Sequence, residues 1–95
     1  MLNRLRVQTL AVTAMCRISE LVAAKGEPEE AARWAARARQ FDPLNERAGR
    51  LFVASLDAGG DRSGARSAAT ELLATLTEAG LEADAATARL VARIS

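Results

Sequence analysis

The sequence contains no histidine and no tyrosine, and it has only one cysteine. A Ser-His or Cys-His nucleophile pair therefore cannot form, and a zinc site would have to be built from Cys16 and carboxylates. The single cysteine also excludes an internal disulfide, which favours a cytoplasmic location. We therefore expect that the chain is not an enzyme and that it binds no cofactor and no metal. Cys16 is interpreted as a small, partly buried hydrophobic residue, with a redox or metal role as the alternative.

The chain also lacks an excess of charge of either sign, since 13 basic and 12 acidic residues leave a net charge of +1. Such a balance produces no general attraction to nucleic acid or to a membrane surface. No uncharged apolar run approaches the roughly 20 residues of a membrane span. Arg4, Arg6 and Arg17 interrupt the apolar N-terminus, which argues against a secretory signal. We therefore expect no direct nucleic-acid binding and no membrane partner.

Large apolar side chains are scarce, because 22 of the 95 residues are alanine and aromatic residues make up 3%. A core of this composition has to gain its stability from close approach of helices. The length corresponds to one domain. Together these features favour a stack of tight helical hairpins.

An internal echo at an offset of thirty-four residues supports that interpretation. The matched pairs are Ala24 with Ala58, Gly26 with Gly60, Ala31 with Ala65, and Ala35 with Ala69. A period of this size is typical of helical repeats, and thirty-four is the tetratricopeptide length. Ala31 and Ala65, one turn into the second helix of each hairpin, are predicted to be tight helix–helix contacts.

Apolar periodicity and turn residues predict five helices near residues 2–25, 28–41, 44–58, 62–79 and 85–94, and no stretch has the alternation of a strand. Asp42 is the predicted N-cap of the third helix, with Pro43 in its first turn. Gly80 and Leu81 have the pattern of a helix C-terminus. The predicted core face of the first helix is Val7, Leu10, Ala11, Ala14, Met15, Ile18, Leu21 and Val22. For the other helices the predicted core positions are Ala31, Ala35, Ala38, Ala48, Leu51, Phe52, Ser55, Leu56, Ala65, Ala69, Leu72, Leu76, Ala79, Ala88, Val91 and Ile94. The predicted fold class is all-α.

Several motifs resemble one bacterial family in combination. They are Ala24-Lys25-Gly26, Asp42-Pro43-Leu44-Asn45-Glu46, Ala58-Gly59-Gly60-Asp61, Gly80-Leu81-Glu82, and Asp84 followed by Thr87-Ala88-Arg89-Leu90. With this spacing the chain resembles the bacterial transcriptional activator domain of the Streptomyces antibiotic regulatory protein family. The resemblance implies a tetratricopeptide-like domain, residues 1–95, that belongs to a larger regulator. It also implies that the domain acts by dimerisation or partner contact, while a separate winged-helix domain reads DNA.

Tetratricopeptide geometry also implies which side chains line the concave groove. Among these positions the candidate partner-binding residues are Arg17, Glu20, Arg47, Arg50 and Asp57. Three arginines on the groove side would suit an acidic helix or a terminal carboxylate. The alternative is that they are ordinary solvated arginines. Trp34 either packs at the edge of the first hairpin or anchors a partner.

Two functions remain open at this point. The first is a non-catalytic interaction domain of a bacterial transcriptional activator, whose partner is another protein or a second copy. The second is a stand-alone adaptor that binds a peptide in its groove.

Overall fold

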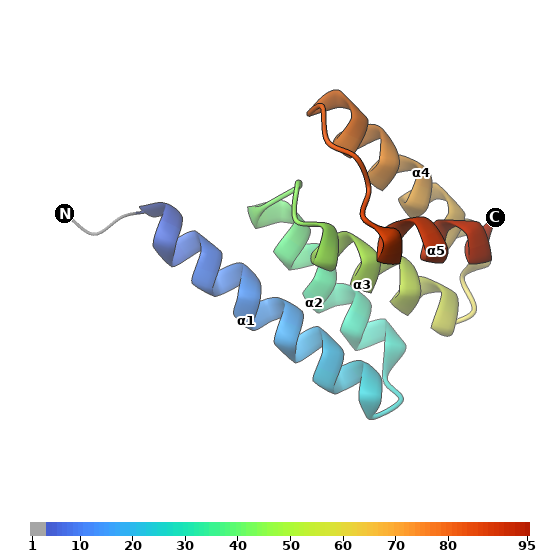
Figure 1. Ribbon diagram of the computed structural model, residues 1–95. Helices are drawn as coiled ribbons and strands as arrows, with labels where there is room; N and C mark the ends of the chain where they lie inside the picture. Colours follow the sequence, from blue (N-terminus) through green and yellow to red (C-terminus); the bar gives the residue numbers. More distant parts are fainter. Residues whose placement is uncertain (1–3) are drawn as a thin grey trace.

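The computed structural model describes residues 4–95 and, within them, consists of helices joined by short turns (Figure 1). The helices are α1 (Arg4–Ala24), α2 (Pro28–Phe41), α3 (Glu46–Ala58), α4 (Arg62–Glu78) and α5 (Ala85–Ile94). Successive helices run antiparallel, so the predicted all-α fold of helical hairpins is confirmed. The predicted ends of the last four helices agree with the structure to within two residues. The predicted start of the first helix, at residues 2 and 3, lies outside the described residues.

Three helices end on a glycine with positive φ, and Gly60 shows how this reverses the chain. Its φ is 88°, and its N–H donates to Asp57 O at 3.0 Å. The next N–H, that of Asp61, reaches back to Leu56 O at 2.9 Å. These two bonds form a Schellman motif. The same motif at Gly80 and Leu81 confirms the predicted end of the fourth helix.

The start of α3 differs from the prediction. Asn45, and not Asp42, is its N-cap, and its side chain accepts a hydrogen bond from Ala48 N at 2.9 Å. The Asp42 carboxylate instead accepts from Leu44 N at 3.2 Å and so stabilises the turn before the helix. Both residue types can do either task. The structure assigns the turn to the aspartate and the cap to the asparagine, which shifts the helix start to Glu46.

The helices pack in chain order into a slab of 44 × 33 × 18 Å, with α3 in the middle. Besides α2 and α4, helix α3 also touches α1 and α5. One core cluster lies among α1, α2 and α3 and consists of Val12, Met15, Cys16, Ala38 and Ala48. The other lies among α3, α4 and α5 and consists of Val53, Ala65, Ala68, Ala69, Leu90 and Ile94.

The predicted alanine contacts are confirmed. Ala31, Ala35, Ala38 and Ala65 are all 0% exposed. At the first hairpin the hydroxyl of Ser19, also fully buried, donates to Ala31 O at 2.8 Å. A side chain larger than a methyl group has no room at these positions, so the alanines set the distance between neighbouring helices.

The predicted core face of α1 is largely wrong. The residues of α1 that the fold buries are Val12, Met15, Cys16 and Ser19. Of the predicted set only Met15 is among them; Val7, Leu10, Ala14 and Leu21 are exposed, and Ala11, Ile18 and Val22 are half-buried. Apolar residues occur on opposite sides of this helix. The periodicity of the sequence is therefore compatible with two core faces. Packing against α2 and α3 buries the face of Val12, Cys16 and Ser19, which is not the predicted one.

Smaller corrections apply to the later helices. In α3 the buried residues are Ala48, Gly49, Val53 and Ser55, whereas the predicted Leu51, Phe52 and Leu56 are half-buried. In α4 the predicted core is confirmed except for exposed Ala79, and Ala68 is added. In α5 the buried residues are Thr87, Leu90 and Ile94, while Ala88 is exposed and Val91 half-buried. A methyl group added at Gly49 would lie 2.6 Å from Leu72 Cδ1, so the absence of a side chain lets α4 approach α3.

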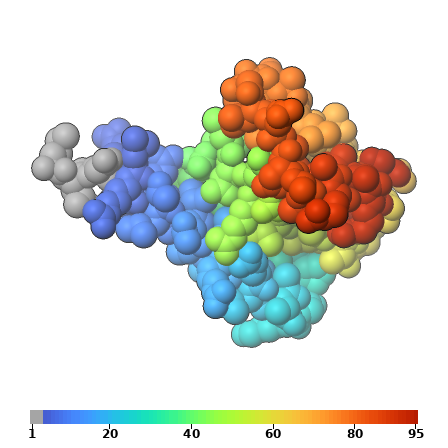
Figure 2. Space-filling model, in the orientation of Figure 1, coloured from blue at the N-terminus to red at the C-terminus, as the bar shows by residue number. Residues whose placement is uncertain are grey.

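Within the described residues, α1 is the one helix with the length and apolar composition of a membrane span, and 22% of its apolar window is buried. Core helices of water-soluble proteins and signal sequences share these two properties. The space-filling view shows the N-terminal turns of α1 projecting beyond the rest of the molecule (Figure 2).

Candidate functional site

Glu20 of α1 and Arg47 of α3, both groove candidates, form a two-point ion pair. Arg47 Nη2 donates to Glu20 Oε1 at 2.6 Å, and Arg47 Nε donates to Oε2 at 3.0 Å. These hydrogen bonds hold the pKa of Glu20 below its usual value and raise that of Arg47. Each side chain is 38% exposed. The fork of Arg47 is thus already occupied by a carboxylate of the same chain.

Cys16 lies beside this pair and is 1% exposed. Burial raises the pKa of its thiol, although the nearby Arg47 opposes that shift. A protonated, buried thiol is a poor nucleophile and a poor metal ligand. The structure thus places Cys16 in the core between the first three helices, more deeply than the sequence indicated.

Arg50, the third arginine of the groove set, ties α5 to α3. Its Nη1 donates to both carboxylate oxygens of Asp84 at 3.1 Å and to Thr87 Oγ1 at 3.0 Å. Thr87 in turn donates its hydroxyl proton to Glu46 Oε2 at 2.7 Å, and Asp84 N donates to the same oxygen at 3.0 Å. Asp84 caps α5 by accepting from Thr87 N, and this bond above all lowers the pKa of Asp84. These hydrogen bonds attach the start of α5 to α3, and we call this network the α3–α5 joint.

The other two groove candidates behave differently from each other. Asp57 accepts a hydrogen bond from Arg62 Nη1 at 3.3 Å, across the turn between α3 and α4. Arg17 is exposed and has no ion-pair partner within residues 4–95. The structure therefore joins four of the five candidates to partners of their own chain, and Arg17 alone keeps an open guanidinium. Sequence reasoning missed Thr87 as a partner of Arg50, because the two residues are 37 positions apart. It also missed Glu46, although Glu46 precedes Arg50 by four residues on the same helix, a spacing at which side chains meet.

Trp34 lies at the edge of the first hairpin, half-buried against the core cluster of α1, α2 and α3. The guanidinium of Arg37 lies 5.0 Å from the centre of its ring, which is a cation–π contact. A shallow hollow of about 410 Å³ on α2 surrounds it and is lined by Glu30, Arg33, Trp34, Ala36, Arg37 and Gln40. Of the two interpretations of Trp34, the contacts match edge packing.

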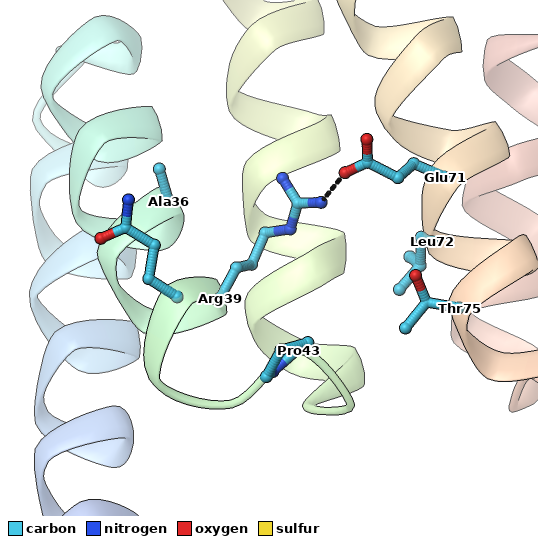
Figure 3. A pocket seen from close by; sticks show the side chains of 7 residues that line it. Ala36, Arg39, Pro43, Glu71, Leu72 and Thr75 are labelled. Carbon is cyan, nitrogen blue, oxygen red and sulfur yellow. Dashed lines mark hydrogen bonds and ion pairs between the residues drawn. The ribbon is translucent and has the colours of Figure 1, made fainter. Parts of the chain in front are cut away.

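A second hollow, of about 380 Å³, lies between α2 and α4 on the opposite side from α5 (Figure 3). Arg39 crosses it to meet Glu71, with Nη2 and Oε1 2.5 Å apart. The same guanidinium lies 4.6 Å from the ring centre of Phe52. Since its charged groups are paired with each other, this hollow presents no free charge to a ligand.

The outward side of α1 leaves several apolar side chains exposed to solvent. Val7, Leu10 and Leu21 are 50%, 63% and 50% exposed, and Ala14 between them is also exposed. We call these four residues the outer strip. They are members of the apolar set that the sequence placed in the core. The signal that distinguishes them was present in the sequence, namely apolar residues on two opposite sides of one helix.

Within residues 4–95 no group of three or more histidine, cysteine, aspartate or glutamate side chains is placed to hold a metal ion. Of the charged groups on the groove side, all but Arg17 are paired within the chain, and the outer strip carries no charge. No family model, no curated protein and no solved structure matches the chain. The geometry and chemistry of the chain itself therefore indicate the candidate functional surface.

Proposed function

We propose that this chain is a non-catalytic, tetratricopeptide-like interaction domain of a bacterial transcriptional activator, working by contact with a partner protein or a second copy. The observation that carries the interaction role is the outer strip. A helix that is apolar on two opposite sides gains stability when both sides are covered, and the fold covers only one. Large exposed apolar patches on otherwise polar surfaces mark places where proteins meet.

The assignment to transcription rests on the resemblance of the turn motifs to the bacterial transcriptional activator domain. In the structure these motifs occupy helix ends: Gly26, Gly60 and Gly80 end helices, and Asp61 and Asp84 cap the next ones. Motifs at these positions support the idea that this chain stacks its hairpins in the same way as that domain. The proposal includes a cytoplasmic location, no direct contact with DNA and no membrane partner.

The second candidate, an adaptor that binds an acidic peptide in the groove, is favoured by one observation. Arg17 is exposed and has no ion-pair partner within the described part of the chain. Such a peptide would have to compete with Glu20 for Arg47 and with Asp84 for Arg50. That competition makes the groove a weaker candidate than the outer strip.

A reporter experiment tests the proposed function. The chain is fused to a heterologous DNA-binding domain that binds its site as a monomer, and transcription from a promoter with that site is measured in bacteria. We expect activation above the level of the DNA-binding domain alone, and loss of most of it in Leu10→Glu. Activation that is absent, or unaffected by Leu10→Glu and Leu21→Glu at equal protein level, would contradict the proposal.

A further inference from the structure

We propose that the outer strip of α1 binds the outer strip of a second copy, with the two α1 helices antiparallel across a two-fold axis at Ala14. This inference rests on the proposed function, since it names the partner of the same surface.

The side of α1 opposite the outer strip is already packed against other helices of the same chain. Val12, Met15 and Ser19 are at most 9% exposed and face α2 and α3. The outer strip is on the other side, so an occupant can cover it without disturbing the core. No rearrangement of the hairpin is required, and the strip is available in the folded monomer.

The spacing of the outer strip is symmetric about Ala14. Val7 and Leu21 are each seven residues from it. In an antiparallel pair centred on this residue, Val7 of one copy meets Leu21 of the other, at both ends of the contact. Leu10 then faces half-buried Ile18, and the two Ala14 methyl groups meet at the axis, where small residues let helices approach closely. A surface that matches itself in this way is what a two-fold interface requires.

The charges at the two ends of the first hairpin favour the antiparallel arrangement. Exposed Arg4 and Arg6 lie at the start of α1. At the other end, exposed Glu27 and Glu29 follow Lys25 around the turn into α2. Antiparallel pairing places the basic end of each copy beside the acidic end of the other. Parallel pairing would place like charges together at both ends.

The size of the surface predicts the strength of the dimer. A helix of 21 residues is about 30 Å long and about 10 Å wide, so its outer face offers on the order of 300 Å². A standard interface buries about 800 Å² on each partner. We therefore expect a weak dimer that depends on concentration and that becomes populated when two copies are brought together.

Analytical ultracentrifugation of the chain from about 1 μM to about 1 mM measures this association. The wild-type average mass should rise from monomer towards dimer, and Leu10→Glu should remain a monomer throughout. The matched control is Leu81→Glu, an exposed leucine (48%) outside the strip, which should associate like the wild type. Circular dichroism establishes that both variants are folded. A wild-type monomer at every concentration, or equal association of Leu10→Glu and wild type, would overturn the proposal.

Disulfide trapping tests the orientation of the helices. Val7→Cys and Leu21→Cys are made separately in a Cys16→Ala background, mixed, and oxidised mildly. A disulfide needs Cα atoms within about 7 Å, so antiparallel pairing predicts a mixed 7–21 product in excess over both homodimers. Thr70→Cys, an exposed position on α4, measures random collision. Predominant 7–7 and 21–21 products, or trapping no faster than for Thr70→Cys, would reject the arrangement.

The two proposals fail in different ways. If the wild type is monomeric while Leu10→Glu abolishes reporter activation, the strip binds a different protein, and self-association is wrong while the proposed function holds. If the wild type dimerises through the strip but the fusion does not activate transcription, the proposed function is wrong while self-association holds.

Discussion

Arg47 of α3 donates two hydrogen bonds to Glu20 of α1, at 2.6 and 3.0 Å, and so links two helices that are not consecutive in the chain. Sequence reasoning had treated both residues as groove positions open to a partner. Their pairing turns two candidate binding residues into a link between the first and third helices. The same holds for Arg50, which the fold uses to attach α5. Partner binding therefore moves, in our proposal, from the groove to the outer strip.

The Glu20–Arg47 pair predicts a specific dependence of stability on pH. The pKa of Glu20 is lower in the folded chain than its ordinary value of about 4.3. The pair therefore stabilises the fold above that ordinary value, and the contribution is lost as pH falls through the lower folded-state pKa. Both side chains are 38% exposed, so we expect less than about 1 kcal/mol.

Denaturant midpoints of wild type and Glu20→Gln measure this contribution. The variant should be less stable at pH 7, and the difference should disappear once the pH is below the folded-state pKa of Glu20. Glu78→Gln, at an exposed carboxylate of α4, is the control and should change little at either pH. A difference between Glu20→Gln and wild type that persists in acid would mean that the side chain acts through something other than its charge.

The buried alanines predict sensitivity to larger side chains. Ala31→Leu and Ala65→Leu should each destabilise the fold by about 1–3 kcal/mol, because both positions are 0% exposed and packed between helices. Ala88→Leu, on the exposed side of α5, should leave the free energy of unfolding nearly unchanged. Urea midpoints for the three variants check this, and unchanged midpoints for Ala31→Leu and Ala65→Leu would disprove the tight packing.

Adjacent glycines in the α3–α4 turn should respond differently to alanine. Gly60 has a φ of 88°, a conformation that costs an L-residue about 1–2 kcal/mol. Gly59 has a φ of −82°, and a methyl group there would meet nothing closer than 3.4 Å. Gly60→Ala should therefore lower thermal stability, while Gly59→Ala should be neutral or slightly stabilising. Equal effects of the two substitutions would show that the turn is not as described.

A buried hydroxyl, that of Thr87, takes part in the hydrogen-bond network between α3 and α5. Thr87 is 0% exposed, donates to Glu46 and accepts from Arg50. Thr87→Val keeps the shape and removes both bonds, so we expect a loss of about 1–3 kcal/mol. In Thr87→Val, amide hydrogen exchange relative to the wild type should become faster in α5 and change less in α2, which would show that the loss of stability is local to α5. Thr77→Val, at an exposed threonine, is the control, and a Thr87→Val variant as stable as wild type would refute the joint.

The net charge of +1 predicts that the isolated chain does not bind duplex DNA. Its basic residues are distributed over the helices, and several are paired with carboxylates. Fluorescence anisotropy with a labelled duplex at physiological ionic strength should show no submicromolar binding. Submicromolar binding that weakens steeply with salt would contradict this expectation.

Local chemistry allowed much of the fold to be predicted from sequence. The ends of α2, α4 and α5 follow from residues within one turn of them: Pro28, the glycines at 26, 60 and 80, and the caps Asp61 and Asp84. The burial of Ala31 and Ala65 was also predictable, because the thirty-four-residue echo places both at equivalent positions. These features depend on neighbours in the sequence or on a repeat that the sequence displays.

The tertiary structure decided what local pattern left ambiguous. Helix α1 is apolar on two sides, and only packing against α2 and α3 determined that Val12 is buried and Leu10 is exposed. The partners of Arg47 and Arg50 lie 27 and 34 residues away, at Glu20 and Asp84, a separation over which sequence alone carries no signal of contact. Helix ends are set by hydrogen bonds between near neighbours. The buried face of a helix and the partner of a charge are set by segments that meet only when the chain has folded.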